Sequence, residues 1–145
     1  MSEPIDTEAR DVDLAAERLL GAIEAGCESA LDFPGKLDAA LGAAFALLAT
    51  EPDLIPPLTS YCAPEPARAQ QHSFCATCAA RLRAAAESAG SRDEHLLPLV
   101  ETFLVAAVKF EASRALFEDK TSLLPGRAPD FRDLILGYYA SVGAP

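Results

Sequence analysis

Apolar side chains recur at three- and four-residue steps along most of the chain, which predicts amphipathic helices. The first helix is predicted over residues 6–31 with Asp6 as its N-cap, and the second over residues 33–51 with Asp32 as its cap. Four prolines between residues 53 and 66 restrict that stretch to short helical turns, and a third long helix is predicted over residues 67–89. No stretch alternates at period two, so we expect an all-α bundle of about five to six helices.

Two further helices are predicted within residues 91–143, on either side of a Pro/Gly break at residues 124–129, and Asp130 is expected to cap the second. They carry more apolar side chains than a small antiparallel pair can cover, which predicts a homodimer. The candidate dimer contacts are Val105, Val108, Ala112, Phe131, Leu134, Ile135 and Tyr138. Glu101 and Lys109 interrupt the apolar face and are interpreted as a solvated edge, with pairing across the dimer axis as the alternative.

Charge and composition narrow the functional classes. The formal net charge is −10, and residues 1–65 contain 3 basic and 13 acidic side chains. Because phosphate binding requires clustered Lys and Arg, we expect no direct nucleic-acid binding, and the acidic surface is interpreted as a solubility feature. The apolar runs are too short to cross a bilayer and the acidic N-terminus does not resemble a signal peptide. We therefore expect a cytoplasmic protein with one domain over residues 1–145 and no membrane association.

The sharpest local motif contains His72, Cys75 and Cys78, with Cys62 upstream. Two thiolates at this spacing with an imidazole can bind zinc, and Cys62 would supply the fourth ligand. The preferred interpretation is that Cys75 and Cys78 pack as small apolar residues on one helix face, so no metal is predicted. Thiol redox chemistry is a third interpretation, although no strand is predicted before the motif.

No constellation in the sequence points to catalysis. Glu24 and Glu28 lie four residues apart on a polar helix face, where carboxylates are normally solvated. The sequence contains neither a glycine-rich phosphate loop nor a nucleophile elbow. No enzyme activity and no cofactor are predicted.

The order and boundaries of the helices carry a family resemblance. One helix is entered through Phe33-Pro34 and ends at the acidic-Pro-acidic step Glu51-Pro52-Asp53, and the last helix ends near Gly137 and Tyr139. From about Val12 onward, this pattern resembles the C-terminal domain of TetR-family transcriptional regulators. Members of that family begin with a DNA-reading helix-turn-helix, which has no counterpart here. The chain is expected to be either a natural stand-alone module or a fragment of a longer regulator, and the opening Met1 and its neighbours favour the first.

The resemblance implies a helical core that encloses a small-molecule pocket, and a dimer in which the last two long helices form a four-helix bundle. Aromatic, soft and polar side chains on several helices are the candidates for ligand contacts, with a filled core as the alternative for each. They are Phe45, Tyr61, His72, Phe74, Cys75, Cys78 and Phe103.

The predicted function is therefore regulatory: a homodimer that binds a small apolar molecule without contacting nucleic acid itself. Two alternatives stay open. The first is a protein-interaction module that forms heterodimers with a full-length regulator and withholds it from DNA. The second is a zinc or thiol-redox protein that uses Cys62, Cys75 and Cys78.

Overall fold

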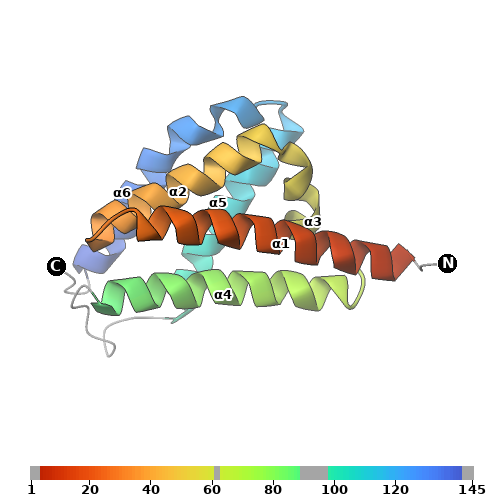
Figure 1. The fold of residues 1–145 in the computed structure, drawn as a ribbon, viewed down its shortest axis with the longest axis horizontal. Helices are drawn as coiled ribbons and strands as arrows, with labels where there is room; N and C mark the ends of the chain where they lie inside the picture. Colours follow the sequence, from red (N-terminus) through yellow and green to blue (C-terminus); the bar gives the residue numbers. More distant parts are fainter. Residues whose placement is uncertain (1–3, 61–62, 89–97, 142–145) are drawn as a thin grey trace.

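The computed structural model describes residues 4–60, 63–88 and 98–141, and within these ranges the protein is helical throughout (Figure 1). The six α-helices are α1 (Pro4–Glu28), α2 (Phe33–Thr50), α3 (Ile55–Thr59), α4 (Ala67–Ser88), α5 (Pro98–Phe117) and α6 (Ala128–Ser141). Two 3₁₀ segments, η1 (Pro52–Leu54) and η3 (Thr121–Arg127), precede α3 and α6. The predicted all-α class is confirmed, and no strand occurs in the described ranges.

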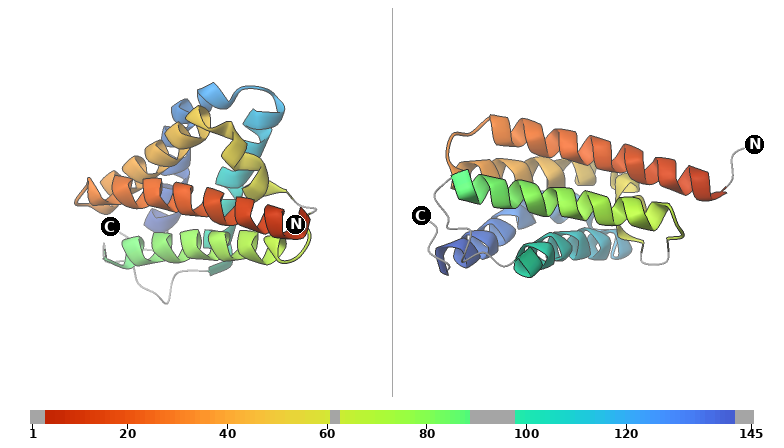
Figure 2. Two further views of the ribbon diagram at one scale, coloured as in Figure 1. Left: turned by 45° about the vertical axis from the view of Figure 1, so that its right-hand side comes forward. Right: turned by 90° about the horizontal axis from the view of Figure 1, so that it is seen from below.

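Helix α2 lies at the centre of the arrangement. It packs against α1 on one side and against α6 and η3 on the other. Helices α1 and α4 lie side by side and run in the same direction (Figures 1 and 2). In the view of Figure 1, α1, α2 and α3 outline a triangle, with α5 and α6 behind it. The helices therefore surround a common interior.

Local sequence explains where α2 begins and ends. Oδ1 of Asp32 accepts a hydrogen bond of 2.8 Å from the backbone N–H of Gly35, and Pro34 occupies the first turn, where its missing N–H costs nothing. The helix ends at Thr50, two residues before Pro52, because a residue preceding proline avoids helical backbone angles. The Asp32 cap predicted from the sequence is confirmed.

Three predicted helix boundaries are wrong. Asp6 does not cap α1, which already includes Pro4. Asp130 does not cap α6, which starts at Ala128 directly after η3, because Pro129 is tolerated in a first helical turn. Helix α1 ends at Glu28, so Leu31, predicted as its last residue, lies beyond the helix and is fully exposed. The predicted boundaries at residues 89, 91 and 143 lie outside the described residues.

Gly26 permits the close approach of α1 to α2. A Cβ at this position would lie 2.7 Å from the backbone oxygen of Ala39, closer than a real Cβ contact. A residue without a side chain is therefore required near the end of α1, where the chain turns back into α2.

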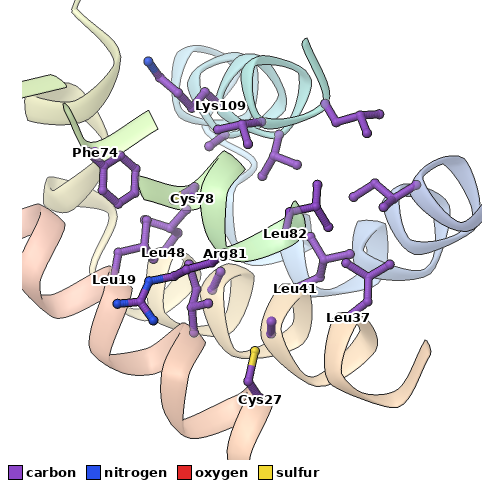
Figure 3. A pocket seen from close by; sticks show the side chains of 18 of the residues that line it. Leu19, Cys27, Leu37, Leu41, Leu48, Phe74, Cys78, Arg81, Leu82 and Lys109 are labelled. Carbon is purple, nitrogen blue, oxygen red and sulfur yellow. The ribbon is translucent and has the colours of Figure 1, made fainter. Parts of the chain in front are cut away.

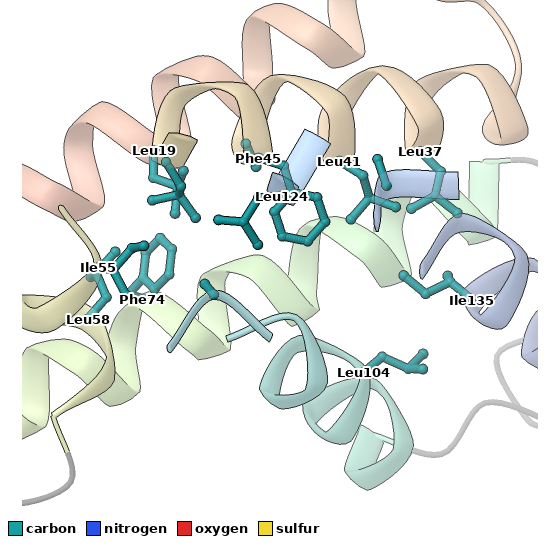
Figure 4. Close-up of a cluster of buried hydrophobic side chains, with 14 of the residues drawn as sticks. Leu19, Leu37, Leu41, Phe45, Ile55, Leu58, Phe74, Leu104, Leu124 and Ile135 are labelled. Carbon is teal, nitrogen blue, oxygen red and sulfur yellow. The ribbon is translucent and has the colours of Figure 1, made fainter. Parts of the chain in front are cut away.

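Buried apolar side chains from every helix meet around α2 (Figure 4). Phe45 is completely buried and its ring lies 5.7 Å from that of Phe131, which holds α6 against α2. Phe33 makes an edge-on contact with Tyr139 at 5.3 Å, further along the same pair of helices. Labelled members of this core in Figure 4 are Leu19, Leu37, Leu41, Phe45, Ile55, Leu58, Phe74, Leu104, Leu124 and Ile135.

Within the described ranges, no single helix combines the length and the apolar character needed to cross a membrane. Helix α2 meets the criterion only jointly with the segment Pro52–Thr59, from which it is bent by 105°.

Candidate functional site

A cavity of about 170 Å³ lies between the helices and is lined by residues from all six α-helices (Figure 3). Leucine, isoleucine, valine, alanine and phenylalanine make up most of the wall. The larger apolar side chains that line it are Leu19, Ile23, Phe33, Leu37, Leu41, Leu48, Ile55, Leu58, Phe74, Leu82, Leu104, Val105, Val108 and Ile135.

Alanines on facing helices explain why the space stays open. Ala40 and Ala44 of α2, Ala85 of α4 and Ala112 of α5 all line the cavity. Larger side chains such as Leu82 line the same cavity, and the short alanine side chains leave the space between them unfilled. The cavity is a consequence of this alternation of large and small residues.

The polar side chains at the cavity include three cations and no carboxylate: Lys36 of α2, Arg81 of α4 and Lys109 of α5. Arg81 forms an ion pair with Glu24 of α1. Nζ of Lys109 donates a hydrogen bond of 3.2 Å to Sγ of Cys75. The edges of an otherwise apolar cavity are therefore positively charged.

Two thiols line the same cavity, and both are held in the protonated form. Burial raises the pKa of Cys78 to about 12, with a further rise from Cys75, and Arg81 and Lys109 only partly oppose it. Burial also raises the pKa of Cys27. Because the thiolate is the reactive species, these groups behave at neutral pH as small apolar side chains.

Of the seven residues expected to contact a ligand, the structure places only some at the cavity. Phe74 and Cys78 line the cavity. Phe45 lies in the core outside the cavity wall, and Cys75 is half-buried beside Lys109. His72 is exposed, Phe103 is 64% exposed, and neither lines the cavity, because their positions on α4 and α5 point outward. Tyr61 lies outside the described residues.

The zinc interpretation gains no support from the part of the chain that the structure describes. There, no three His, Cys, Asp or Glu side chains lie close enough to share a metal ion. Cys62, the fourth ligand in that interpretation, falls outside the described ranges.

Most of the expected dimer contacts face the interior of the protomer instead. Ala112 and Ile135 are buried, and both line the cavity together with Val105 and Val108. Phe131 and Tyr138 are half-buried against the core. Of the seven, only Leu134 is an exposed side chain, at 52%. A second chain could not reach the buried ones without unfolding the protomer, which corrects their assignment.

The outward face of α5 carries a different apolar surface, which we call the phenylalanine stripe: Phe103, Phe110 and Phe117. Their exposed fractions are 64%, 60% and 92%. The seven-residue spacing places all three on one side of the helix, opposite the side that lines the cavity. Sequence reasoning placed Phe103 inside because α5 has apolar residues on both faces.

Glu101, expected at a solvated edge, is 2% exposed. One of its oxygens accepts a hydrogen bond of 2.7 Å from Nε of Arg83, and the other accepts one of 2.7 Å from the hydroxyl of Tyr139. Glu101 precedes Leu104 by three residues and Val108 by seven, so the helical spacing alone placed it on the inward face. That signal was available in the sequence.

No protein-family model, no curated protein and no solved structure matches this chain.

Proposed function

We propose that this chain is a regulatory module that binds a small molecule and dimerises, like the C-terminal domain of TetR-family regulators, without enzymatic chemistry. The observation that carries the proposal is the apolar cavity of about 170 Å³. Protein interiors usually fill such space, and an apolar cavity of about 150 Å³ is large enough to bind benzene. A small apolar molecule in the cavity would make van der Waals contacts with lining side chains that otherwise face empty space.

Helix α5 offers a physical route from ligand to assembly. Its inner face contributes Val105, Val108 and Ala112 to the cavity wall, and its outer face carries the phenylalanine stripe. A ligand that pushes on the inner face of this helix would change the position of the outer face. Ligand binding and dimer geometry would then be linked through one rigid element.

The proposed occupant of the phenylalanine stripe is a second copy of this chain. Phe110 lies seven residues from both Phe103 and Phe117, so the stripe is symmetric about its centre. A twofold axis at Phe110 would place Phe103 against Phe117 of the other copy. The small side chains of Ala106 and Ala107 flank the stripe and permit two α5 helices to approach closely.

The area of the stripe suits a dimer. At their exposed fractions, the six phenylalanines of two copies would bury on the order of 800 Å². A stable interface needs roughly 1,200 Å² or more, so the stripe supplies most of the requirement. Helix α6 packs mainly against α2 rather than against α5, so this interface would be centred on α5.

The heterodimer alternative uses the same surface, because another regulator with an apolar helix could cover the stripe. Light scattering on the pure chain separates the two. If the pure chain is a dimer at micromolar concentration, a second copy covers the phenylalanine stripe. If it stays monomeric, the partner that covers the stripe is a different chain.

The cavity itself is tested by filling it. In Ala112→Leu, a larger side chain enters the cavity from α5, and binding of toluene or 1-octanol should be lost while the helical content is retained. Ala84→Leu, an exposed position on α4, is the matched control and should bind like the parent chain. If neither probe raises the melting temperature of the parent chain, the proposal fails.

A further inference from the structure

We propose that the cavity accepts a small carboxylate with an apolar body, and that Lys36 and Arg81 hold its carboxylate where α1, α2 and α4 meet. This inference rests on the proposed function, because it names the class of molecule bound there. A cavity of about 150 Å³ holds the six carbons of benzene, so 170 Å³ suits a body of roughly six to eight carbons.

The sign of the charge around the cavity is the first argument. The chain has 22 acidic and 12 basic residues, yet all three charged side chains that line the cavity are basic. If the charged residues at the cavity matched the overall composition of the chain, most of them would be carboxylates. Instead, a molecule with a negative group would be attracted to the cavity edge, and one with a positive group would be repelled.

The positions of two of these cations define where a carboxylate would sit. Figure 3 shows Arg81 extending from α4 toward α1, on the side of the cavity where Cys27 lies. Its guanidinium reaches Glu24, one turn before Cys27 in α1. Cys27 lies near both cations: its Sγ is 4.0 Å from the backbone oxygen of Lys36, and the charges of Lys36 and Arg81 both oppose the rise that burial causes in the pKa of its thiol. Lys109 lies on the opposite side of α4, next to Cys75.

The chemistry of these two side chains fits a carboxylate. A guanidinium is planar and can donate two parallel hydrogen bonds to the two oxygens of a carboxylate. Arg81 shares its charge with Glu24, but no carboxylate of the described ranges forms an ion pair with the half-buried Lys36. Lys36 can therefore balance the charge of a ligand while the apolar body lies against Leu41 and Ala44.

The test compares three probes of equal length on the full chain at neutral pH: octanoate, 1-octanol and octylamine, measured by isothermal titration calorimetry. Octanoate should bind most tightly and octylamine most weakly. If 1-octanol binds as tightly as octanoate, this inference is overturned while the proposed function stands. If none of the three binds, both fail.

Charge-neutralising variants locate the carboxylate. Lys36→Gln should weaken octanoate binding by roughly threefold to tenfold and leave 1-octanol binding unchanged. Glu24→Gln should strengthen octanoate binding, because it removes the competing carboxylate from Arg81. Arg68→Gln, at an exposed position paired with Glu65, is the control and should change neither. A larger loss in Lys109→Gln than in Lys36→Gln, or an equal loss for both probes, would overturn the assignment.

Discussion

The hydroxyl of Tyr139 donates a hydrogen bond of 2.7 Å to Oε2 of Glu101 inside the protein. Arg83 donates to the other oxygen at the same distance, so one carboxylate joins α4, α5 and α6. None of these three side chains lines the cavity, but all three of their helices do. The cluster therefore fixes the spacing of the helices that form the cavity wall.

Tyr139→Phe should lower the free energy of unfolding by roughly 1.5–3 kcal/mol, because it removes a buried hydrogen bond to a charged group and leaves one oxygen of Glu101 unpaired. Urea unfolding followed by circular dichroism measures the change. Glu118→Gln, which disrupts only a partly exposed pair with Arg114, should cost less than about 1 kcal/mol. Equal losses in the two variants would contradict the role given to Tyr139.

The helices could be predicted from the sequence because their signals are local. Asp32, Pro34 and Pro52 determine the limits of α2 through interactions within a few residues. The end of α1 was predicted three residues too late, because Ser29 already leaves the helix and its backbone N–H donates to the oxygen of Gly26.

The site could be predicted only in part. Phe74 and Cys78 were correctly assigned to an interior face, because they recur with Leu82 at four-residue steps on α4. In α5, by contrast, Leu104 faces inward and Phe103 outward, although both are large and apolar. Apolar residues recur on two faces of this helix, and the packing of α3, α4 and η3 decides which face is covered.

Stability should fall in alkaline solution because of Cys78. Its pKa in the folded protein, about 12, lies above the ordinary value near 9, so the unfolded chain releases this proton first. The stabilising contribution is complete below about pH 9 and is lost as the pH rises, by up to about 1.4 kcal/mol per pH unit. The raised pKa of Tyr139, caused by burial and by its bond to Glu101, acts in the same direction above about pH 10.

Cys78→Ala isolates the thiol contribution. Between about pH 8 and pH 10, the free energy of unfolding should fall less steeply in this variant than in the parent chain. Urea unfolding at a series of pH values gives both slopes. Identical slopes would show that Cys78 titrates normally in the folded protein.

If the chain dimerises through the phenylalanine stripe as proposed, Phe110→Glu should make it monomeric. One carboxylate from each copy would be buried at the centre of the proposed interface, and burying these unpaired charges opposes association. Because Phe110 is 60% exposed in the protomer, the helical content should be retained. Leu14→Glu, a similarly exposed apolar position on α1, is the control and should remain dimeric by light scattering. A dimer that survives Phe110→Glu would place the interface elsewhere.

Two glycines of α1 should respond to alanine in opposite ways. Gly26→Ala should destabilise the protein by roughly 1–3 kcal/mol, because the new Cβ would lie 2.7 Å from the backbone oxygen of Ala39 and force α1 away from α2. Gly21→Ala meets no atom within 4 Å and should stabilise the same helix by up to about 1 kcal/mol, since alanine is the better helix former. Thermal and urea unfolding of both variants measure the difference. The same sign for both changes would show that the backbones at Gly26 and Ala39 are not in close contact.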